Sequence, residues 1–131
     1  MEKEKLVRAA YQAKEFSYAP YSNFHVGAAL LGESGRVYLG CNIENAAFSP
    51  TNCAERTAVF KAVSEGERKF KAIALAGDKE EYLTPCGVCR QVMAEFCDPG
   101  DFQVICAKNE TDFRVYTLQE LFPEGFSPEN L

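Results

Sequence analysis

The chain has 131 residues, a length that fits one domain able to bury a hydrophobic core without disulfide bonds. Its residues are 47% hydrophobic and 25% charged, which excludes an intrinsically disordered chain. The net charge of −5 argues against binding to nucleic acid, because a polyanion binder needs a basic surface. No apolar stretch exceeds strand length, and the N-terminus lacks the basic start of a secretory signal. We therefore expect a cytoplasmic protein without a membrane span, whose partner is a small ligand or another copy of the chain.

The spacing of apolar residues predicts the secondary structure. In chain order we expect a helix, two strands joined by a turn, a loop, a helix, a strand, a helix, two strands and a short helix. The expected helices span 3–17, 53–65, 84–96 and 118–122, and the expected strands span 26–31, 37–41, 72–76, 102–107 and 113–116. The loop is expected at 42–52. Strands separated by helices predict an α/β sheet with helices on both faces and right-handed crossovers. Neither a repeat nor a linker interrupts the pattern, so residues 1–131 are expected to form a single domain.

Each of the three long helices is expected to bury one apolar face. The expected core positions are Leu6, Ala10, Ala13 and Ser17 in the first, Ala54, Ala58 and Ala62 in the second, and Val88, Val92 and Phe96 in the third.

Six cysteines in a chain without an export signal point to metal binding or catalysis more than to disulfides. Cys86-Gly-Val-Cys89 can aim two sulfurs at one point, which suits tetrahedral zinc. Alone, this motif also fits a redox pair or half of a structural zinc site. Cys53, at the start of the preceding helix, offers a third thiolate. Three cysteines leave the fourth zinc position open, which is the mark of a catalytic zinc site.

Glu55 follows the first cysteine by two residues, near the metal but outside its expected ligands. A carboxylate there can take a proton from zinc-activated water and return it to a substrate nitrogen. A ligand-x-Glu motif followed by Pro-Cys-x-x-Cys is characteristic of zinc deaminases. Because Zn²⁺ with three thiolates is anionic, its ability to acidify water is weakened unless charge is withdrawn. We expect the two helix N-termini and Arg56 to compensate, with Arg90 as the alternative donor.

Several segments together resemble a known family. They are Tyr18-Ala-Pro-Tyr-Ser22, Val26-Gly-Ala-Ala-Leu30, Gly40-Cys-Asn-Ile-Glu-Asn-Ala46, Cys53-Ala-Glu-Arg-Thr57, Pro85-Cys-Gly-Val-Cys-Arg-Gln-Val92 and the tail Phe126-Ser-Pro-Glu-Asn-Leu131. Over nearly its whole length the chain resembles the small, homotetrameric cytidine deaminases of pyrimidine nucleoside salvage. The resemblance implies a three-layer α/β/α sandwich with a mixed five-stranded sheet, and one Zn²⁺ per chain. It also implies hydrolytic deamination of free cytidine and deoxycytidine to uridine and deoxyuridine, with release of ammonia.

The same resemblance assigns substrate contacts. Asn42 and Glu44 are expected to bind the ribose hydroxyls, although the pair also suits a purely loop-stabilising role. Phe24 would pack against the pyrimidine, and Phe126 would reach into a neighbouring subunit's site; either could instead be plain core. The main chain of Ala54 and of Thr84 would read the base edges.

Other positions carry less information. Phe48 stands where many relatives have tyrosine, and Val88 replaces the commoner alanine between the zinc cysteines. His25, the single histidine, is expected to be structural. Cys41, Cys97 and Cys106 are expected to act as small apolar residues, with Cys97 as the alternative fourth zinc ligand.

Two rival functions remain open from the sequence. The first is a non-enzymatic zinc module, which would hold its metal with four protein ligands. The second is a deaminase that acts on nucleic acid or on a nucleotide. The acidic balance and the absence of a basic cluster near the motifs argue against the second.

Overall fold

The structure is a computed structural model that describes residues 1–131. Its centre is a five-stranded sheet with the strand order β2-β1-β3-β4-β5. The strands are β1 (Gly27–Gly32), β2 (Val37–Cys41), β3 (Phe70–Ala76), β4 (Gln103–Ala107) and β5 (Phe113–Thr117). β3 and β4 pair in parallel, whereas all other neighbours are antiparallel. The sheet is therefore mixed, as expected.

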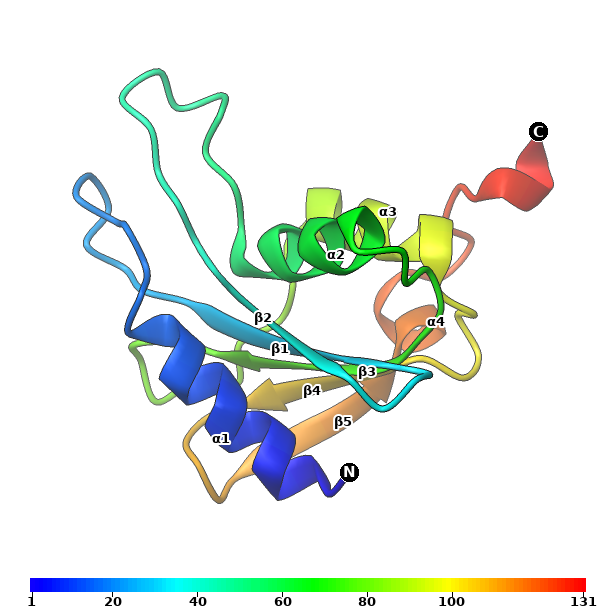
Figure 1. The fold of residues 1–131 in the computed structure, drawn as a ribbon, viewed down its shortest axis with the longest axis horizontal. Coiled ribbons are helices and arrows are strands. Elements are labelled where there is room, and N and C mark those ends of the chain that lie inside the picture. The colour runs from blue at the N-terminus through cyan, green and yellow to red at the C-terminus, as the bar shows by residue number, and fades with distance from the viewer.

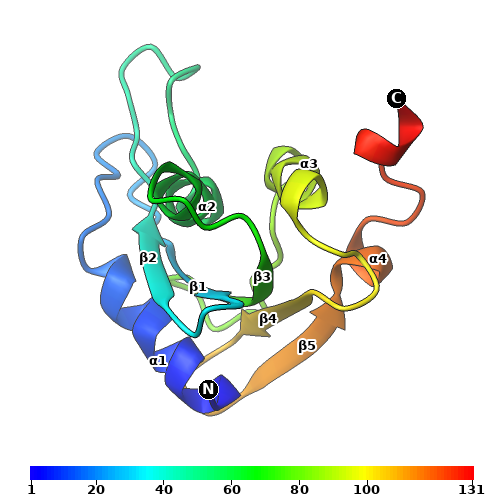
Figure 2. The same cartoon turned by 45° about the vertical axis from the view of Figure 1, so that its right-hand side comes forward.

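Helices cover both faces of this sheet. α1 (Lys3–Lys14) lies on one face, and α2 (Ala54–Ser64) and α3 (Gly87–Phe96) lie side by side on the other (Figures 1 and 2). α4 (Leu118–Leu121) follows β5, and a 3₁₀ turn, η1 (Pro128–Asn130), lies close to the C-terminus. The expected three-layer α/β/α sandwich is confirmed.

The two sides of the sheet bury separate hydrophobic clusters. The α1 side contains Leu6, Val7 and Ala10, packed on alternate residues of β1, β3 and β4. The α2–α3 side is larger and contains Ala58, Met93 and their neighbours. The alternation of inward side chains along each central strand supplies both clusters at once. Residues that act on the α2–α3 side are therefore separated from α1 by a layer of packed sheet.

Two sequence predictions about helices are wrong in detail. The first helix ends at Lys14 rather than at residue 17, because the main-chain N–H of Tyr18 donates to Asn42 main-chain oxygen, as does the Ser17 hydroxyl. In α3 the expected stripe is only partly buried: Val92 and Phe96 pack against the core cluster, but Val88 is 57% exposed. The helix instead turns Cys89 and Met93 inward, one position further along the chain.

The close packing of α2 on β2 depends on Gly40. A Cβ atom at this position would lie 2.4 Å from the Ala54 carbonyl oxygen and 2.6 Å from the Ala58 nitrogen. Only glycine lets the first turn of the helix approach the strand so closely. The start of α2, and with it the side chains that it carries, is thus fixed against the sheet.

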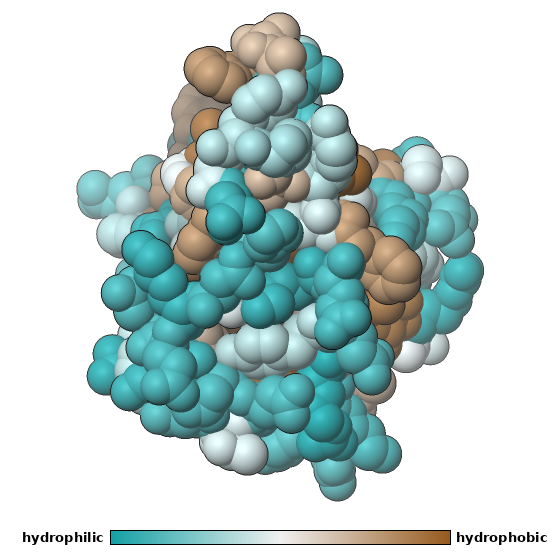
Figure 3. All heavy atoms as spheres, turned by 90° about the vertical axis from the view of Figure 1, so that its left-hand side faces the viewer, coloured by the Kyte–Doolittle hydropathy of each residue, from teal (hydrophilic) through white to brown (hydrophobic).

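Two long loops leave the same end of the sheet. The segment between α1 and β1 and the segment between β2 and α2 project together, away from the C-terminal tail (Figures 1 and 2). The second loop exposes Ile43 and Phe48, and Tyr21 of the first loop meets Phe48 edge to face at 6.1 Å. Apolar side chains accordingly gather on the upper part of this face, above a hydrophilic lower part (Figure 3). None of the helices has the length and apolar character needed to cross a bilayer.

Candidate active site

Three cysteine sulfurs meet where two helices begin. Cys53 is the N-cap residue of α2, Cys86 is the N-cap residue of α3, and Cys89 lies in the first turn of α3. Cys53 Sγ is 3.7 Å from Cys86 Sγ, which is 3.4 Å from Cys89 Sγ, and all three lie within 4.8 Å of one another. Residues distant in sequence are thus brought to one point by the packing of α2 and α3 on the same face.

The sulfur cluster fits a single zinc ion. Zn–S bonds of about 2.3 Å in a tetrahedron place two sulfurs about 3.8 Å apart, close to the separations seen here. No fourth metal-binding side chain joins the cluster. Cys97, the alternative ligand, lies at the opposite end of α3, where burial raises the pKa of its thiol to about 12. Three protein ligands and one free position are the arrangement of a catalytic zinc site, not of a structural one.

Positive charge reaches the sulfurs from Arg56 and from the backbone. Arg56 Nη2 donates a hydrogen bond to Cys53 Sγ at 3.3 Å, and both sulfurs at N-cap positions face the positive end of a helix. Hydrogen bonds from Cys89 and Arg56 lower the pKa of the Cys53 thiol against the effect of burial. Arg90 is engaged elsewhere, because its guanidinium binds the carbonyl oxygens of Pro85 and Leu121. Arg56, not Arg90, therefore has the contact that charge compensation requires.

The Arg56 guanidinium is also incompletely paired. Its Nε is buried and has no hydrogen-bond partner within the chain. A buried charged donor without an acceptor is costly, so the site favours anionic groups beside it. Metal-bound thiolates are such groups.

Glu55 lies in the first turn of α2 and is the one carboxylate of the hydrophobic core, with 5% of its surface exposed. Burial raises the pKa of its carboxyl group to about 7, against the opposing hydrogen bond from its own main-chain N–H. A carboxyl group with a pKa near neutrality can both accept and return a proton. Its position two residues after Cys53 keeps it beside the metal ligands and outside their cluster.

The side chains of Asn42 and Glu44 already hold the loop before β1. Asn42 Nδ2 donates to Phe24 oxygen at 2.8 Å, and its Oδ1 accepts from Val26 nitrogen at 2.9 Å. Glu44 Oε1 accepts from the nitrogens of Tyr21 and Ser22 at 2.9 and 3.1 Å. The loop-stabilising role is therefore present. One N–H of Asn42 and lone pairs of the Glu44 carboxylate stay available for a sugar.

Phe24 and Thr84 border one cavity. This cavity has a volume of about 210 Å³ and is also lined by Gly77, Tyr82 and Leu83. Phe24 is half-buried and Thr84 is exposed, whereas Ala54 is fully buried at the start of α2. The geometry therefore places the Phe24 ring and the Thr84 main chain around a common space.

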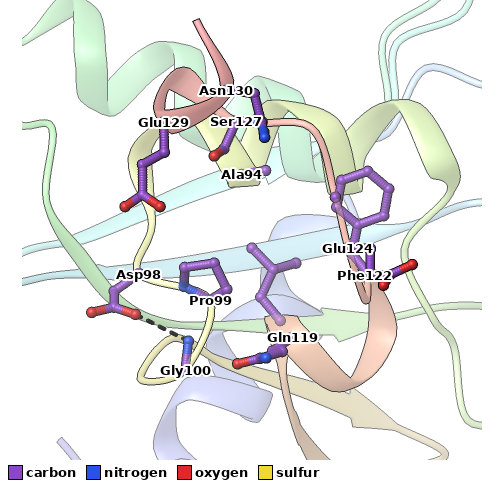
Figure 4. A pocket seen from close by; sticks show the side chains of 12 residues that line it. Ala94, Asp98, Pro99, Gly100, Gln119, Phe122, Glu124, Ser127, Glu129 and Asn130 are labelled. Carbon is purple, nitrogen blue, oxygen red and sulfur yellow. Dashed lines mark hydrogen bonds between the residues drawn. The ribbon is translucent and has the colours of Figure 1, made fainter.

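Phe126 is 56% exposed and lies in the C-terminal tail, on the opposite side of the helices from the two loops (Figures 1 and 2). Gln91 Nε2 holds its main-chain oxygen at 2.8 Å. A cavity of about 400 Å³ lies beneath this tail, between Asp98 and Pro99 on one side and Ser127 and Asn130 on the other (Figure 4). None of the expected catalytic, metal-binding or substrate-binding residues lines this cavity, so it is separate from the candidate active site.

The match to known proteins covers most of the chain. The family model of the cytidine and deoxycytidylate deaminase zinc-binding region matches residues 1–106. The chain belongs to this family. Within the family, it is 53% identical to the cytidine deaminase of Sporosarcina psychrophila over 131 residues, which is 100% of this chain and 96% of that protein. It is 50% identical to the cytidine deaminase of Halalkalibacterium halodurans, over 100% of this chain and 98% of that protein.

Solved structures agree with these relatives. The crystal structure of cytidine deaminase from Burkholderia pseudomallei matches with a TM-score of 0.91 and 46% identity, over 96% of this chain and all of that one. The cytidine deaminase from Mycobacterium tuberculosis matches with a TM-score of 0.84 and 36% identity, over 96% and 98% of the two chains. Membership of a zinc-binding deaminase family and a three-cysteine cluster together identify the chain as a zinc-dependent deaminase.

Proposed function

We propose that the chain catalyses the hydrolytic deamination of free cytidine to uridine and ammonia, and that of deoxycytidine to deoxyuridine. The observation that carries this proposal is the buried Glu55 carboxyl group beside three clustered cysteines that leave one metal position open. A non-enzymatic zinc module would fill that position with a fourth protein ligand and would give the buried carboxylate no task. Identities of 50% and above to proteins named cytidine deaminase support the choice of substrate.

In this proposal, Cys53, Cys86 and Cys89 would hold the zinc ion, which when bound would act as a Lewis acid and make water nucleophilic near neutral pH. Glu55 accepts the proton of that water as C4 of the base is attacked, and donates it to N3. It then moves a second proton to the amino group, which leaves as ammonia. With a pKa near neutrality, Glu55 is suited to both directions of transfer. Arg56 limits the negative charge of the sulfurs through its bond to Cys53.

The substrate contacts are part of the same proposal. Phe24 packs on the pyrimidine, the main chain of Ala54 and Thr84 reads the base edges, and Asn42 and Glu44 bind the sugar through their remaining polar atoms. The acidic chain offers little attraction to a phosphate or to a polynucleotide, which favours the free nucleoside. A cytoplasmic location is proposed with it.

We also propose a homotetramer with shared active sites, built on the single domain 1–131. The Phe126 side chain is 56% exposed on the C-terminal tail, where it is free to reach the pocket of a neighbouring subunit. The exposed apolar side chains of the long loops, Ile43 and Phe48 among them, offer surface for such contacts. Full activity of a monomer at high dilution would contradict this sharing.

The decisive experiment incubates the zinc-loaded protein with cytidine and follows the formation of uridine and ammonia. Glu55→Gln keeps the shape of the side chain, so we expect it to bind one zinc per chain while turnover falls about 10²- to 10⁴-fold. Unchanged turnover in this variant would exclude the proton-shuttle role.

Cytidine monophosphate and a cytidine-containing oligonucleotide serve as competing substrates. Preferential turnover of either one would replace the nucleoside proposal with the nucleotide or nucleic-acid rival.

A further inference from the structure

Asp78 joins three elements at the end of the sheet that carries the long loops. It is the second residue after β3, and its Oδ1 is 3.0 Å from Lys14 Nζ at the end of α1. Its Oδ2 accepts the main-chain N–H of His25 at 2.6 Å and lies 2.9 Å from His25 Nδ1. Partial burial raises the pKa of the Asp78 carboxyl, but the bonds from His25 and Lys14 outweigh it and bring the pKa down to about 2. Asp78 is thus an ionised group that binds the residue after Phe24.

The residue before Asp78 supports the Phe24 ring itself. A Cβ atom on Gly77 would lie 3.3 Å from Phe24 Cζ, so the ring rests against the glycine backbone. Residues 77 and 78 therefore hold two consecutive residues of the loop, one through the ring of Phe24 and one through the main chain of His25. No pattern in the sequence indicates this contact, because an aspartate shortly after a strand is common in turns.

The rest of the Phe24 backbone is fixed by uncharged contacts. Its nitrogen donates to Ser22 Oγ at 3.1 Å, and its oxygen accepts from Asn42 Nδ2. Asn23 before it has a φ of 56°, in the left-handed region that asparagine tolerates better than most residues. The main chain that carries the ring is consequently held in place beside the cavity that Phe24 and Thr84 line.

We propose that Asp78 is a positioning residue for substrate binding, acting through His25 and Phe24 to hold the ring against which the pyrimidine packs. This inference rests on the proposed role of Phe24. The charged groups around the contact are Lys14, His25 and, 5.9 Å above the Phe24 ring, Lys79. Loss of the Asp78 charge removes the ion pair with Lys14, which keeps its hydrogen bond to Gly77 oxygen, and weakens the bond to His25. The ring thereby gains freedom while the zinc ligands and Glu55 stay in place.

The test compares Asp78→Asn with wild type in the zinc-loaded protein. We expect KM for cytidine, and the dissociation constant for the product uridine measured by calorimetry, to rise about 3- to 10-fold. The value of kcat and the zinc content should stay within about twofold, a split that general destabilisation does not produce. Glu65→Gln is the matched control, since it removes an exposed ion pair with Arg36 (3.1 Å) at the far end of α2 and should leave KM unchanged.

A double-mutant cycle with Phe24→Ala separates this inference from the proposed function. If Asp78 acts through the ring, Asp78→Asn raises KM in wild type but adds little in the Phe24→Ala background. Equal, multiplicative effects in both backgrounds would overturn the inference, as would an unchanged KM in Asp78→Asn alone. An unchanged KM in Phe24→Ala alone would overturn the role of Phe24 and the inference with it, while deamination itself would still stand.

Discussion

Gly40 offers the sharpest test of how the fold sets the active site, although it contributes no side chain to it. We consider the substitution Gly40→Ala, which adds a single methyl group between β2 and the first turn of α2. The two nearest atoms that it would meet belong to the helix backbone, and the third, Ala58 Cβ at 3.0 Å, is attached rigidly to that backbone. The clash therefore cannot be relieved by a rotamer change, and the helix itself has to move.

The size of that movement follows from the contact distances. Ordinary contact begins at 3.4 Å, whereas the new Cβ would lie 2.4 Å from the Ala54 oxygen, so the start of α2 has to retreat by about 1 Å. Cys53 and Glu55 move with it, but Cys86 and Cys89 belong to α3 and do not. A displacement of 1 Å in a catalytic constellation costs about 10²-fold in rate. Overpacking should also lower the free energy of unfolding by about 1 to 3 kcal/mol.

The assay measures kcat/KM for cytidine, zinc per chain and the free energy of unfolding on the same preparations. Gly87→Ala is the control, because Gly87 lies between two zinc cysteines and a Cβ there has no atom within 4 Å. This control should keep its activity, as its methyl group enters open space at the start of α3. Gly40→Ala with wild-type kcat/KM would refute the reasoning, since α2 would then tolerate displacement without consequence for catalysis.

Three further predictions concern the charges and thiols around the site. Arg56→Gln should lower zinc affinity about 10- to 100-fold in a competition titration, because Cys53 loses its cationic donor. Cys97→Ser should cost about 1 to 3 kcal/mol in denaturant unfolding, since it buries a hydroxyl, yet keep one zinc per chain; loss of zinc would restore Cys97 as a ligand. The low pKa of Asp78 stabilises the folded state above pH 3.8, and this contribution is lost as the pH falls to about 2. Because Asp78 is about one-third exposed, the stability difference between wild type and Asp78→Asn should shrink by only about 1 kcal/mol over that interval, and a constant difference would argue against the ion pair.

The sequence predicted the architecture because strong local signals and the family resemblance agreed. The β2 bounds, Val37–Cys41, match the expectation, and the alanines of α2 are buried as their spacing predicts. The failures have local causes. The α1 boundary depends on Asn42, which lies far along the chain, and no periodicity reveals such a partner. In α3, metal-ligand spacing brings Cys89 inward, and this tertiary requirement overrides the more apolar stripe that begins at Val88.

For the candidate active site, motif spacing predicted the three cysteines that cluster in the fold and the buried Glu55, because zinc deaminase chemistry requires those residue types at that spacing. Motif spacing could not show which hydrogen-bond partners each polar side chain binds in the folded chain. Arg56 and Arg90 look equivalent along the chain, and only the fold shows that Arg90 is engaged with two carbonyl oxygens. Similarly, the sequence left open whether Asn42 stabilises its loop, and in the fold it does so with most of its hydrogen-bonding capacity.

The sulfur ligands come from two helices whose first residues lie 33 positions apart, and this makes folding and metal supply interdependent. An unfolded chain does not preform such a site, so zinc bound only by the folded state adds to its stability. At a free zinc concentration 1,000 times the dissociation constant, the gain is about 4 kcal/mol. A cell that buffers zinc more tightly would therefore hold less folded enzyme as well as less loaded enzyme. The melting temperature should fall on chelation and recover when zinc is restored.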